Sequence, residues 1–299
     1  MLLHRRLFKD KIARHIMLGL TLLSLLFLVV IGVGLFIKAL PILQEKKIWT
    51  LLTSGNWKPF KGEFGFLPYI MSTIHVTLIA IIIALPPSLL TSIYLTEYAS
   101  EKVKRFFYPI IDLLSGIPPV IYGIWGVLTV APFIADKLAP HFVEFSTGYT
   151  VLAGGIVLSI MIIPLIISIM TEVFKSIPKE MREASLSLGA TKWQTIKKVV
   201  LRKSISGLIA ATVLSISRAF GETIAVLMVC GNVPEIPHSM FDSCYPLPAL
   251  IANNYGEMLS LPSYEAALML AAFLLFIIIV FFNAISRVTL YQIEKRYHV

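Results

Sequence analysis

Charged residues are scarce in this sequence, where Asp, Glu, Lys and Arg make up 14% of 299 residues. Soluble domains have about a quarter of their residues charged, so the composition excludes an ordinary soluble domain. Hydrophobic residues make up 57% of the chain. This balance indicates a membrane protein, in which long apolar segments are buried in lipid.

Cysteine is also scarce, since the chain has only Cys230 and Cys244. Their spacing excludes a disulfide framework and gives no metal-ligand motif. One disulfide between them stays open if both face an oxidising compartment, and two free thiols are the simpler interpretation. We therefore expect no metal site.

Motifs of nucleotide hydrolysis and covalent catalysis are missing as well. The chain has no G-x-x-x-x-G-K-[ST] phosphate loop, no H-E-x-x-H and no G-x-S-x-G. We therefore expect no enzyme activity, no bound cofactor and no ATP hydrolysis on this chain.

The formal net charge of +9 would suggest nucleic acid in a soluble protein. Here the basic residues lie at the ends of apolar runs, which indicates membrane orientation and lipid contact rather than a nucleic-acid partner.

Six apolar runs are each long enough to cross a bilayer as an α-helix. The first run follows a basic tail, at residues 1–15, that resembles the start of a signal peptide. The run is too long for a signal peptide and lacks a small-residue cleavage pattern, so we expect a retained membrane helix. We predict an all-α, polytopic membrane protein with six transmembrane helices. The predicted spans are 16–40, 67–95, 106–133, 150–174, 204–230 and 264–290.

These runs divide the chain into a cytoplasmic tail at 1–15, a first helix with an external loop at 16–66, a main membrane domain at 67–290 and a cytoplasmic tail at 291–299. Within the third run, SGIPPVIYGIWG (Ser115–Gly126) is rich in Gly and Pro and predicts a kinked or broken helix. Such a break lines a pathway in some membrane proteins and is a packing kink in others.

Basic residues are distributed unequally between the two sides of the predicted membrane. The N-terminal tail, the loops after the second and fourth runs and the C-terminal end together have 19 Lys and Arg residues. The loops on the other side have five. By the positive-inside rule, the more basic side is cytoplasmic. Both termini are therefore expected in the cytoplasm, as an even number of spans requires.

The most basic loop, at 175–203, has the pattern of two short helices. Met181, Ala184 and Leu188 recur at helical spacing and form one apolar face, and Gly189 follows as a turn or C-cap. From these features alone, the loop could lie on anionic lipid or dock on a soluble partner, and both interpretations stay open.

The same loop resembles the EAA loop of ABC importer permeases. In EASLSLG, residues Glu183, Ala184 and Gly189 match the motif. Departures from it are Ser185, Val199 and Arg202. The resemblance implies a type I ABC importer permease whose loop forms a coupling helix on a separate ATPase subunit. The residues assigned to coupling are Met181, Glu183, Ala184, Leu188 and Gly189.

Further stretches resemble the phosphate-specific ABC permeases of the PstC type. They are SRAFGETIAVLMVCGN, LPALIANNYGE, IPPVIYGIWG and IMIIPLIIS, and the likeness extends over residues 65–290. The resemblance implies one of two permease subunits of an ATP-driven importer of inorganic phosphate in the cytoplasmic (inner) membrane. It also implies a PstA-like second permease, PstB-like ATPases that use the ATP at the cytoplasmic face, and an external phosphate-binding protein.

Two charged residues lie within the fifth predicted span. On a continuous helix, Arg218 and Glu222 are one turn apart and can face each other. A charge at the bilayer centre costs about 2.5–3.5 kcal/mol, so the pair needs a reason. One interpretation is an ion pair that only orients the helices. The other is a phosphate pathway near the bilayer midplane, because a guanidinium binds a tetrahedral oxyanion through two bonds.

In the pathway interpretation, Glu222 neutralises Arg218 when phosphate is absent, and phosphate entry loosens the pair. Ser217 and Thr223 flank the pair and could bond phosphate oxygens or backbone carbonyls one turn earlier. The resemblance implies the same roles for Arg218 and Glu222, and a similar pair on the second permease.

Other polar residues are weaker candidates. We interpret Asp112 as a structural or interfacial residue and His75 as a packed polar residue. Contacts with the external receptor are predicted for Asn232, Asn253, Asn254 and Glu257.

Three alternatives to a phosphate permease stay open. The first is an ABC permease for another oxyanion, such as sulfate or molybdate, because an arginine fork suits all of them. The second is an ion-coupled secondary transporter, whose signature would be broken helices repeated in the two halves. The sequence has no convincing repeat of this kind, and the EAA loop would then have no purpose. The third is a regulatory subunit without a pathway, in which loss of Arg218 would not affect transport.

Overall fold

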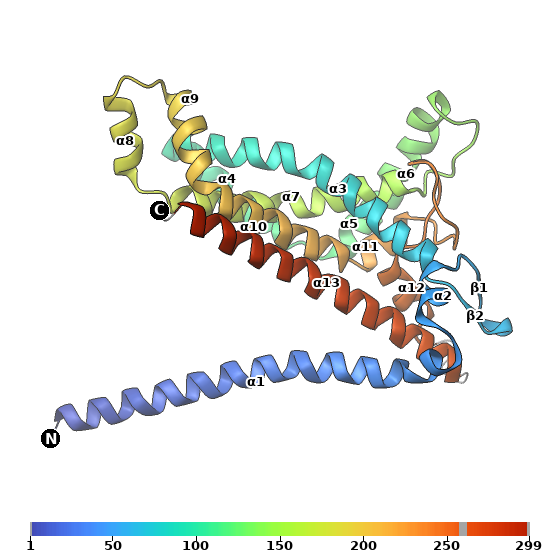
Figure 1. The fold of residues 1–299 in the computed structure, drawn as a ribbon. Helices are drawn as coiled ribbons and strands as arrows, with labels where there is room; N and C mark the ends of the chain where they lie inside the picture. Colours follow the sequence, from blue (N-terminus) through green and yellow to red (C-terminus); the bar gives the residue numbers. More distant parts are fainter. Residues whose placement is uncertain (1, 257–261, 298–299) are drawn as a thin grey trace.

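The computed structural model describes residues 2–256 and 262–297. Figure 1 shows an elongated bundle of long helices, with α8 at one end and strands β1 and β2 at the other. We refer to these as the α8 end and the hairpin end. The helices are α1 (Leu2–Glu45), α2 (Ile48–Thr53), α3 (Leu67–Ile93), α4 (Glu101–Ser115), α5 (Pro119–Trp125), α6 (Ala131–Phe133), α7 (Val151–Lys175), α8 (Lys179–Ser187), α9 (Lys192–Thr195), α10 (Leu201–Phe220), α11 (Ile224–Val229), α12 (Leu247–Asn254) and α13 (Pro262–Tyr297).

Short elements complete the described chain. Strands β1 (Trp57–Lys58) and β2 (Glu63–Phe64) are antiparallel, with Trp57 opposite Phe64. The π-helical turns are Tyr94–Tyr98, Gly126–Val130, Ile134–Leu138 and Ile196–Val200, and the 3₁₀ turns are Pro59–Lys61 and Ala139–His141.

Six segments of the described chain are long and apolar enough to cross a membrane, which confirms the predicted number of spans. Helical hydrogen bonding satisfies the backbone of each segment within itself, as a lipid environment requires. The segments are Lys11–Glu45, Leu67–Tyr98, Pro119–His141, Val151–Lys175, Lys192–Phe220 and Pro262–Ile285.

The third predicted span, 106–133, is wrong at both ends. Its first ten residues belong to α4, a separate helix, and the apolar segment runs from Pro119 to His141. Pro118 has an extended backbone and Pro119 occupies the first turn of α5, so the chain cannot continue as one helix. The predicted break within Ser115–Gly126 is confirmed.

The fifth predicted span, 204–230, is not one helix. α10 ends at Phe220 and α11 begins at Ile224, and the apolar segment Lys192–Phe220 starts and ends earlier than predicted. The N–H of Glu222 bonds to the carbonyl of Ala219 at 3.3 Å, a tighter turn that interrupts the α-helical ladder. The fold therefore places a backbone break inside the stretch that contains the charged pair.

Helices α3 and α7 pack closely against each other along the bundle. Gly155 on α7 lies so near Ile79 on α3 that a Cβ at this position would collide with the isoleucine side chain. The hydroxyl of Ser92 on α3 donates to the carbonyl of Ile167 on α7 at 3.3 Å. Because small residues and interhelical hydrogen bonds hold membrane helices together, α3 and α7 form one closely fitted unit.

At the hairpin end, aromatic rings join strand β1 to α3 and α13. The N-terminal part of α1, in contrast, lies apart from the bundle. Trp57 on β1 contacts the rings of Tyr69 on α3 and Tyr264 on α13, with centroids 5.2 and 6.1 Å apart. α1 packs on α13 where Gly32 meets Phe276, and its N-terminal part diverges in Figure 1. The exposed apolar surface of α1 suits contact with lipid.

Candidate functional site

The EAA segment (residues 179–195) forms the predicted helix, glycine turn and second helix. α8 starts after Pro178, whose extended backbone is typical of a residue that precedes a helix. The helix ends at Ser187 with Leu188 as its C-cap, and Gly189 adopts a left-handed φ of +83°, a conformation that favours glycine. Thr191 and Gln194 then form a reciprocal capping box at the start of α9. The predicted break at Gly189 is confirmed.

The residues of the predicted apolar face of α8 do not all point the same way. Met181 packs against the core of the bundle. Leu188 is 89% exposed, and Glu183 and Ala184 are exposed as well. No residue of α8, which is described in full, is buried. Most of the surface of this helix is therefore free to contact another protein.

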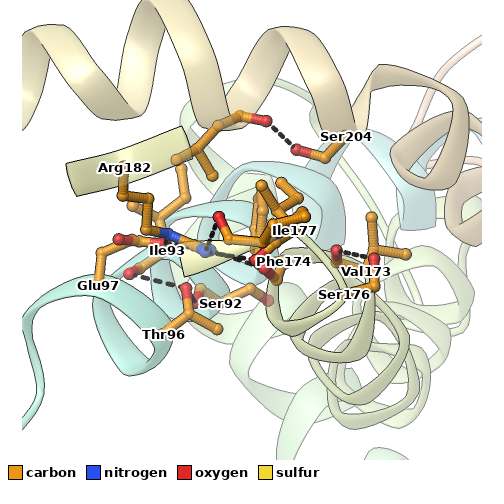
Figure 2. A network of polar contacts seen from close by, with 12 residues as sticks. Ser92, Ile93, Thr96, Glu97, Val173, Phe174, Ser176, Ile177, Arg182 and Ser204 are labelled. Carbon is orange, nitrogen blue, oxygen red and sulfur yellow. Dashed lines mark hydrogen bonds and ion pairs between the residues drawn. The ribbon is translucent and has the colours of Figure 1, made fainter. Parts of the chain in front are cut away.

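One side chain fastens α8 to the bundle, and the sequence reasoning missed it. Arg182 Nη2 lies 2.9 Å from Glu97 Oε1, and Nε donates to the same oxygen at 3.0 Å. Nη1 donates to the carbonyl of Ile177 at 2.6 Å, and Nη2 donates to that of Phe174 at 2.8 Å. Figure 2 shows these groups converging on the guanidinium. The signals in the sequence were weak: Arg182 precedes Glu183 off the apolar face, and Glu97 follows the second apolar run.

Arg218 lies on an exposed side of α10, two residues before the helix ends. Glu222 lies in the turn beyond Phe220, where its Oε1 accepts the N–H of Ala225 at 3.3 Å. Within the described part of the chain, no ion pair joins Arg218 to Glu222 or to another carboxylate. The predicted spacing of one helical turn is therefore wrong, because the helix ends between the two residues.

The two hydroxyl residues beside this pair point in different directions. Ser217 is buried, and its Oγ has no hydrogen-bond partner among the described residues. It lies away from the exposed side that Arg218 occupies. Thr223 is half-buried and donates to the carbonyl of Gly221 at 3.2 Å. The structure therefore places Glu222 and Thr223 in the turn after α10, whereas Ser217 is buried within that helix.

The α10–α11 junction presents the cationic side chain of Arg218 on an exposed side of α10. An arginine without a counter-ion in the described residues has free N–H donors in a planar fork that matches an oxyanion. In Figure 1 the junction lies along the bundle between the α8 end and the hairpin end. A charge at membrane depth needs a partner, which an anionic substrate or a carboxylate of another subunit can supply.

The predicted receptor contacts have internal partners. Asn253 and Asn254 both donate to the hydroxyl of Tyr245, at 2.8 and 3.0 Å. Asn232 donates to a backbone carbonyl at 2.9 Å. Glu257 lies outside the described residues. These bonds orient the three amides, and their contact with a receptor stays a prediction.

The remaining candidates have structural surroundings. Asp112 is exposed on α4, outside the membrane-spanning segments, as an interfacial position requires. His75 is half-buried in α3. Cys230 and Cys244 are buried free thiols. Across residues 2–256 and 262–297, no group of three or more His, Cys, Asp or Glu residues could hold a metal ion.

Relatives of known sequence align with most of the chain. Residues 88–298 match the model of the family "Binding-protein-dependent transport system inner membrane component". The probable ABC transporter permease protein YqgH of Bacillus subtilis (strain 168) is 43% identical over 208 residues, or 69% of this chain and 66% of that protein. The phosphate transport system permease protein PstC of Xylella fastidiosa (strain 9a5c) is 36% identical over 257 residues, or 81% and 79%.

A solved structure supports the architecture. It is a bacterial alginate ABC transporter in complex with a periplasmic protein that holds an alginate pentasaccharide. The match has a TM-score of 0.63 at 14% identity and covers 94% of this chain and 96% of that one. At this identity the likeness shows the fold alone, and it confirms the predicted ABC permease fold.

Proposed function

The chain belongs to the family of binding-protein-dependent transport system inner membrane components, and we propose that it is a permease subunit of an ATP-driven importer of inorganic phosphate. As a member of this family it is a multi-pass membrane protein and a transport subunit. We propose phosphate as the substrate because the chain is similar to a phosphate transport permease over 81% of its length.

The proposed importer contains other proteins besides this chain. A PstA-like permease completes the pathway, PstB-like ATPases hydrolyse ATP, and an external binding protein delivers phosphate. Because the basic side of the protein is cytoplasmic, both termini and the EAA segment face the ATPases. This chain needs no cofactor of its own for that role.

The proposed contact with the ATPase uses the exposed side of α8 and the turn after it. Leu188 offers an apolar side chain that is 89% exposed, and Glu183 adds a charge on the same helix. Exposed apolar groups beside charged ones are typical of protein interfaces. Movement of the ATPases on binding ATP then moves α8, and the spans rock between inward-facing and outward-facing states.

Arg218 is the proposed phosphate contact within the membrane. Its guanidinium donates two N–H bonds to phosphate oxygens as the anion passes the α10–α11 junction. Glu222 keeps a negative charge in the adjoining turn, which weakens anion binding enough for release. A second arginine and carboxylate from the partner permease complete the site where the two subunits meet.

Uptake of labelled phosphate by vesicles that hold the assembled complex tests this proposal. We expect uptake to require ATP, to resist competing sulfate and molybdate, and to collapse in Arg218→Gln. If either competitor abolishes uptake, the substrate is another oxyanion. Normal transport by Arg218→Gln would mean that the pathway lies elsewhere or that the chain is regulatory.

A second experiment tests ATPase docking separately from the pathway. Glu183→Lys reverses a charge on the exposed side of α8, and Gly189→Asp places a negative charge in the exposed turn beside Leu188. We expect both variants to reach the membrane but to bind the ATPase poorly and to lose transport. Full ATPase stimulation by either variant would count against the docking role.

A further inference from the structure

Helix α8 is attached to the bundle by few side chains. Figure 1 shows it outside the bundle, connected through α9 to α10 on one side and to α7 on the other. Met181 packs inward, and the hydroxyl of Ser185 lies 2.9 Å from that of Thr195. No residue along the whole length of α8 is buried. A helix this exposed needs a specific anchor if its movement is to be transmitted to the membrane-spanning helices.

Arg182 supplies that anchor and reaches two membrane-spanning segments at once. Glu97 belongs to the π-helical turn that continues α3, Phe174 lies in the last turn of α7, and Ile177 follows two residues after that helix ends. The carbonyls of the last helical turn lack partners within a helix, and a cation there is favoured by the helix dipole. The Arg182 side chain is 18% exposed and that of Glu97 is 10% exposed, so water screens their attraction only partly.

The two segments that Arg182 joins are packed closely against each other, so we expect them to move together. Ser92 on α3 is bonded to α7, and Gly155 on α7 fits closely against α3. Ser92 lies near the same end of α3 as Glu97, and Figure 2 shows it beside the arginine network. A displacement of α8 that acts through Arg182 is therefore applied to the α3–α7 unit rather than to a single helix.

We propose that Arg182, held by Glu97 and the carbonyls of Phe174 and Ile177, is the positioning residue that transmits movement of the docked ATPase from α8 to the α3–α7 unit. This inference rests on the proposed function. It separates docking, which uses the exposed side of α8, from transmission, which uses the opposite side. Loosening the anchor lets α8 follow the ATPase while the membrane helices lag behind.

The surroundings of the anchor provide a matched control. A cavity of about 530 Å³ beside it is lined by Lys179 and Lys104 as well as by Arg182 and Glu97. Lys104 is paired with Glu101, whereas Lys179 has no ion pair in the described part of the chain. Lys179→Gln therefore removes a charge from the same helix and the same cavity without breaking an anchor.

The experiment measures ATP hydrolysed per labelled phosphate imported by the complete complex in proteoliposomes. Variants are Arg182→Gln, Arg182→Lys, Glu97→Gln and the control Lys179→Gln. We expect a several-fold rise in this ratio for Arg182→Gln and Glu97→Gln, a smaller rise for Arg182→Lys, which keeps one charged donor, and none for Lys179→Gln.

A merely structural role for Arg182 would lower hydrolysis and uptake in proportion and leave the ratio unchanged. An unchanged ratio of ATP hydrolysed to phosphate imported in Glu97→Gln and Arg182→Lys overturns the proposal, even if Arg182→Gln fails to assemble. A wild-type ratio in all variants overturns it as well. Failure of the wild-type complex to import phosphate would instead refute the proposed substrate, and the two failures are thus distinguishable.

Discussion

Two arginines of this chain lie in opposite kinds of surroundings. Arg182 is largely buried and bonds to a carboxylate and to carbonyls at the end of α7. Arg218 is exposed on α10 and has no ion pair within the described residues. The first has its partners inside the chain, so its role is to hold parts of this chain together. For the second we propose a partner from outside the chain, the phosphate anion.

The difference follows from the cost of placing a charge away from water. A buried charge is tolerated when it is paired and hydrogen-bonded, as Arg182 is. In the proposed importer, Arg218 lies where two permeases meet in the membrane, so that it loses access to water and requires an anion or a carboxylate. A substrate that supplies this negative charge only while it passes can be bound and released.

The largest effect is expected at the unpaired arginine. Arg218→Gln removes the charged donors, and we expect phosphate uptake to fall roughly 10- to 100-fold, since a charged hydrogen bond contributes about 1.5–3 kcal/mol. Initial rates of labelled uptake measure the effect. Arg287→Gln, at another exposed arginine, on α13, is the matched control and should transport normally. Equal losses of uptake in Arg218→Gln and Arg287→Gln would show that Arg218 has no special role among the exposed arginines.

A smaller loss, in ATPase binding, is expected when Gly189 in the turn after α8 is replaced. No atom outside its neighbours in the chain would lie within 4 Å of a Cβ at Gly189, so only its φ of +83° restricts the residue there. Gly189→Val costs about 1–2 kcal/mol in that conformation and displaces Leu188, and we expect ATPase binding to weaken about tenfold. Gly189→Asn, which tolerates this φ, should bind almost as wild type does. Binding of the purified ATPase to membranes decides between them.

The acidic neighbour of Arg218 should have a more moderate effect. Glu222→Gln keeps an oxygen that can accept the N–H of Ala225 but removes the negative charge. We expect the uptake rate to fall about 3- to 10-fold because the bound anion is released more slowly, an effect of about 1 kcal/mol. Single-turnover uptake should be affected less than steady-state uptake. An unchanged steady-state rate would show that the charge of Glu222 has no part in release.

The smallest effect is expected at an exposed ion pair near the anchor. The hydrogen bond and the charge of Lys104 lower the pKa of the Glu101 carboxyl below its ordinary value. The contribution of this pair is present above that ordinary pKa and is lost as the pH falls through the lowered one, so it is complete at neutral pH. Exposed pairs contribute little, and we expect less than a twofold change in uptake for Lys104→Gln at pH 7. A loss as large as that of Arg182→Gln would show that charge in this region matters more than its placement.

Local sequence patterns predicted the number of spans and the helix–turn–helix form of the EAA segment. Hydrophobic run length determines how many helices cross the membrane, and the glycine after Leu188 marks a turn by its backbone freedom alone. The interruption after Phe220 was missed because apolarity does not determine whether the backbone is continuous. The pairing of Arg182 with Glu97 was missed because the residues are far apart in sequence and meet only through tertiary packing.

The most direct test of the account is whether phosphate reaches Arg218. In a complex whose chain has Cys230 and Cys244 replaced by alanine, Gly221→Cys, in the exposed turn beside Arg218, and Arg182→Cys are each labelled with a small thiol reagent, with and without phosphate. We predict that phosphate slows labelling at position 221, that sulfate does not, and that neither anion affects position 182. Labelling at position 221 that is unchanged by phosphate, or protection of both positions alike, would contradict the assignment of Arg218 to the pathway.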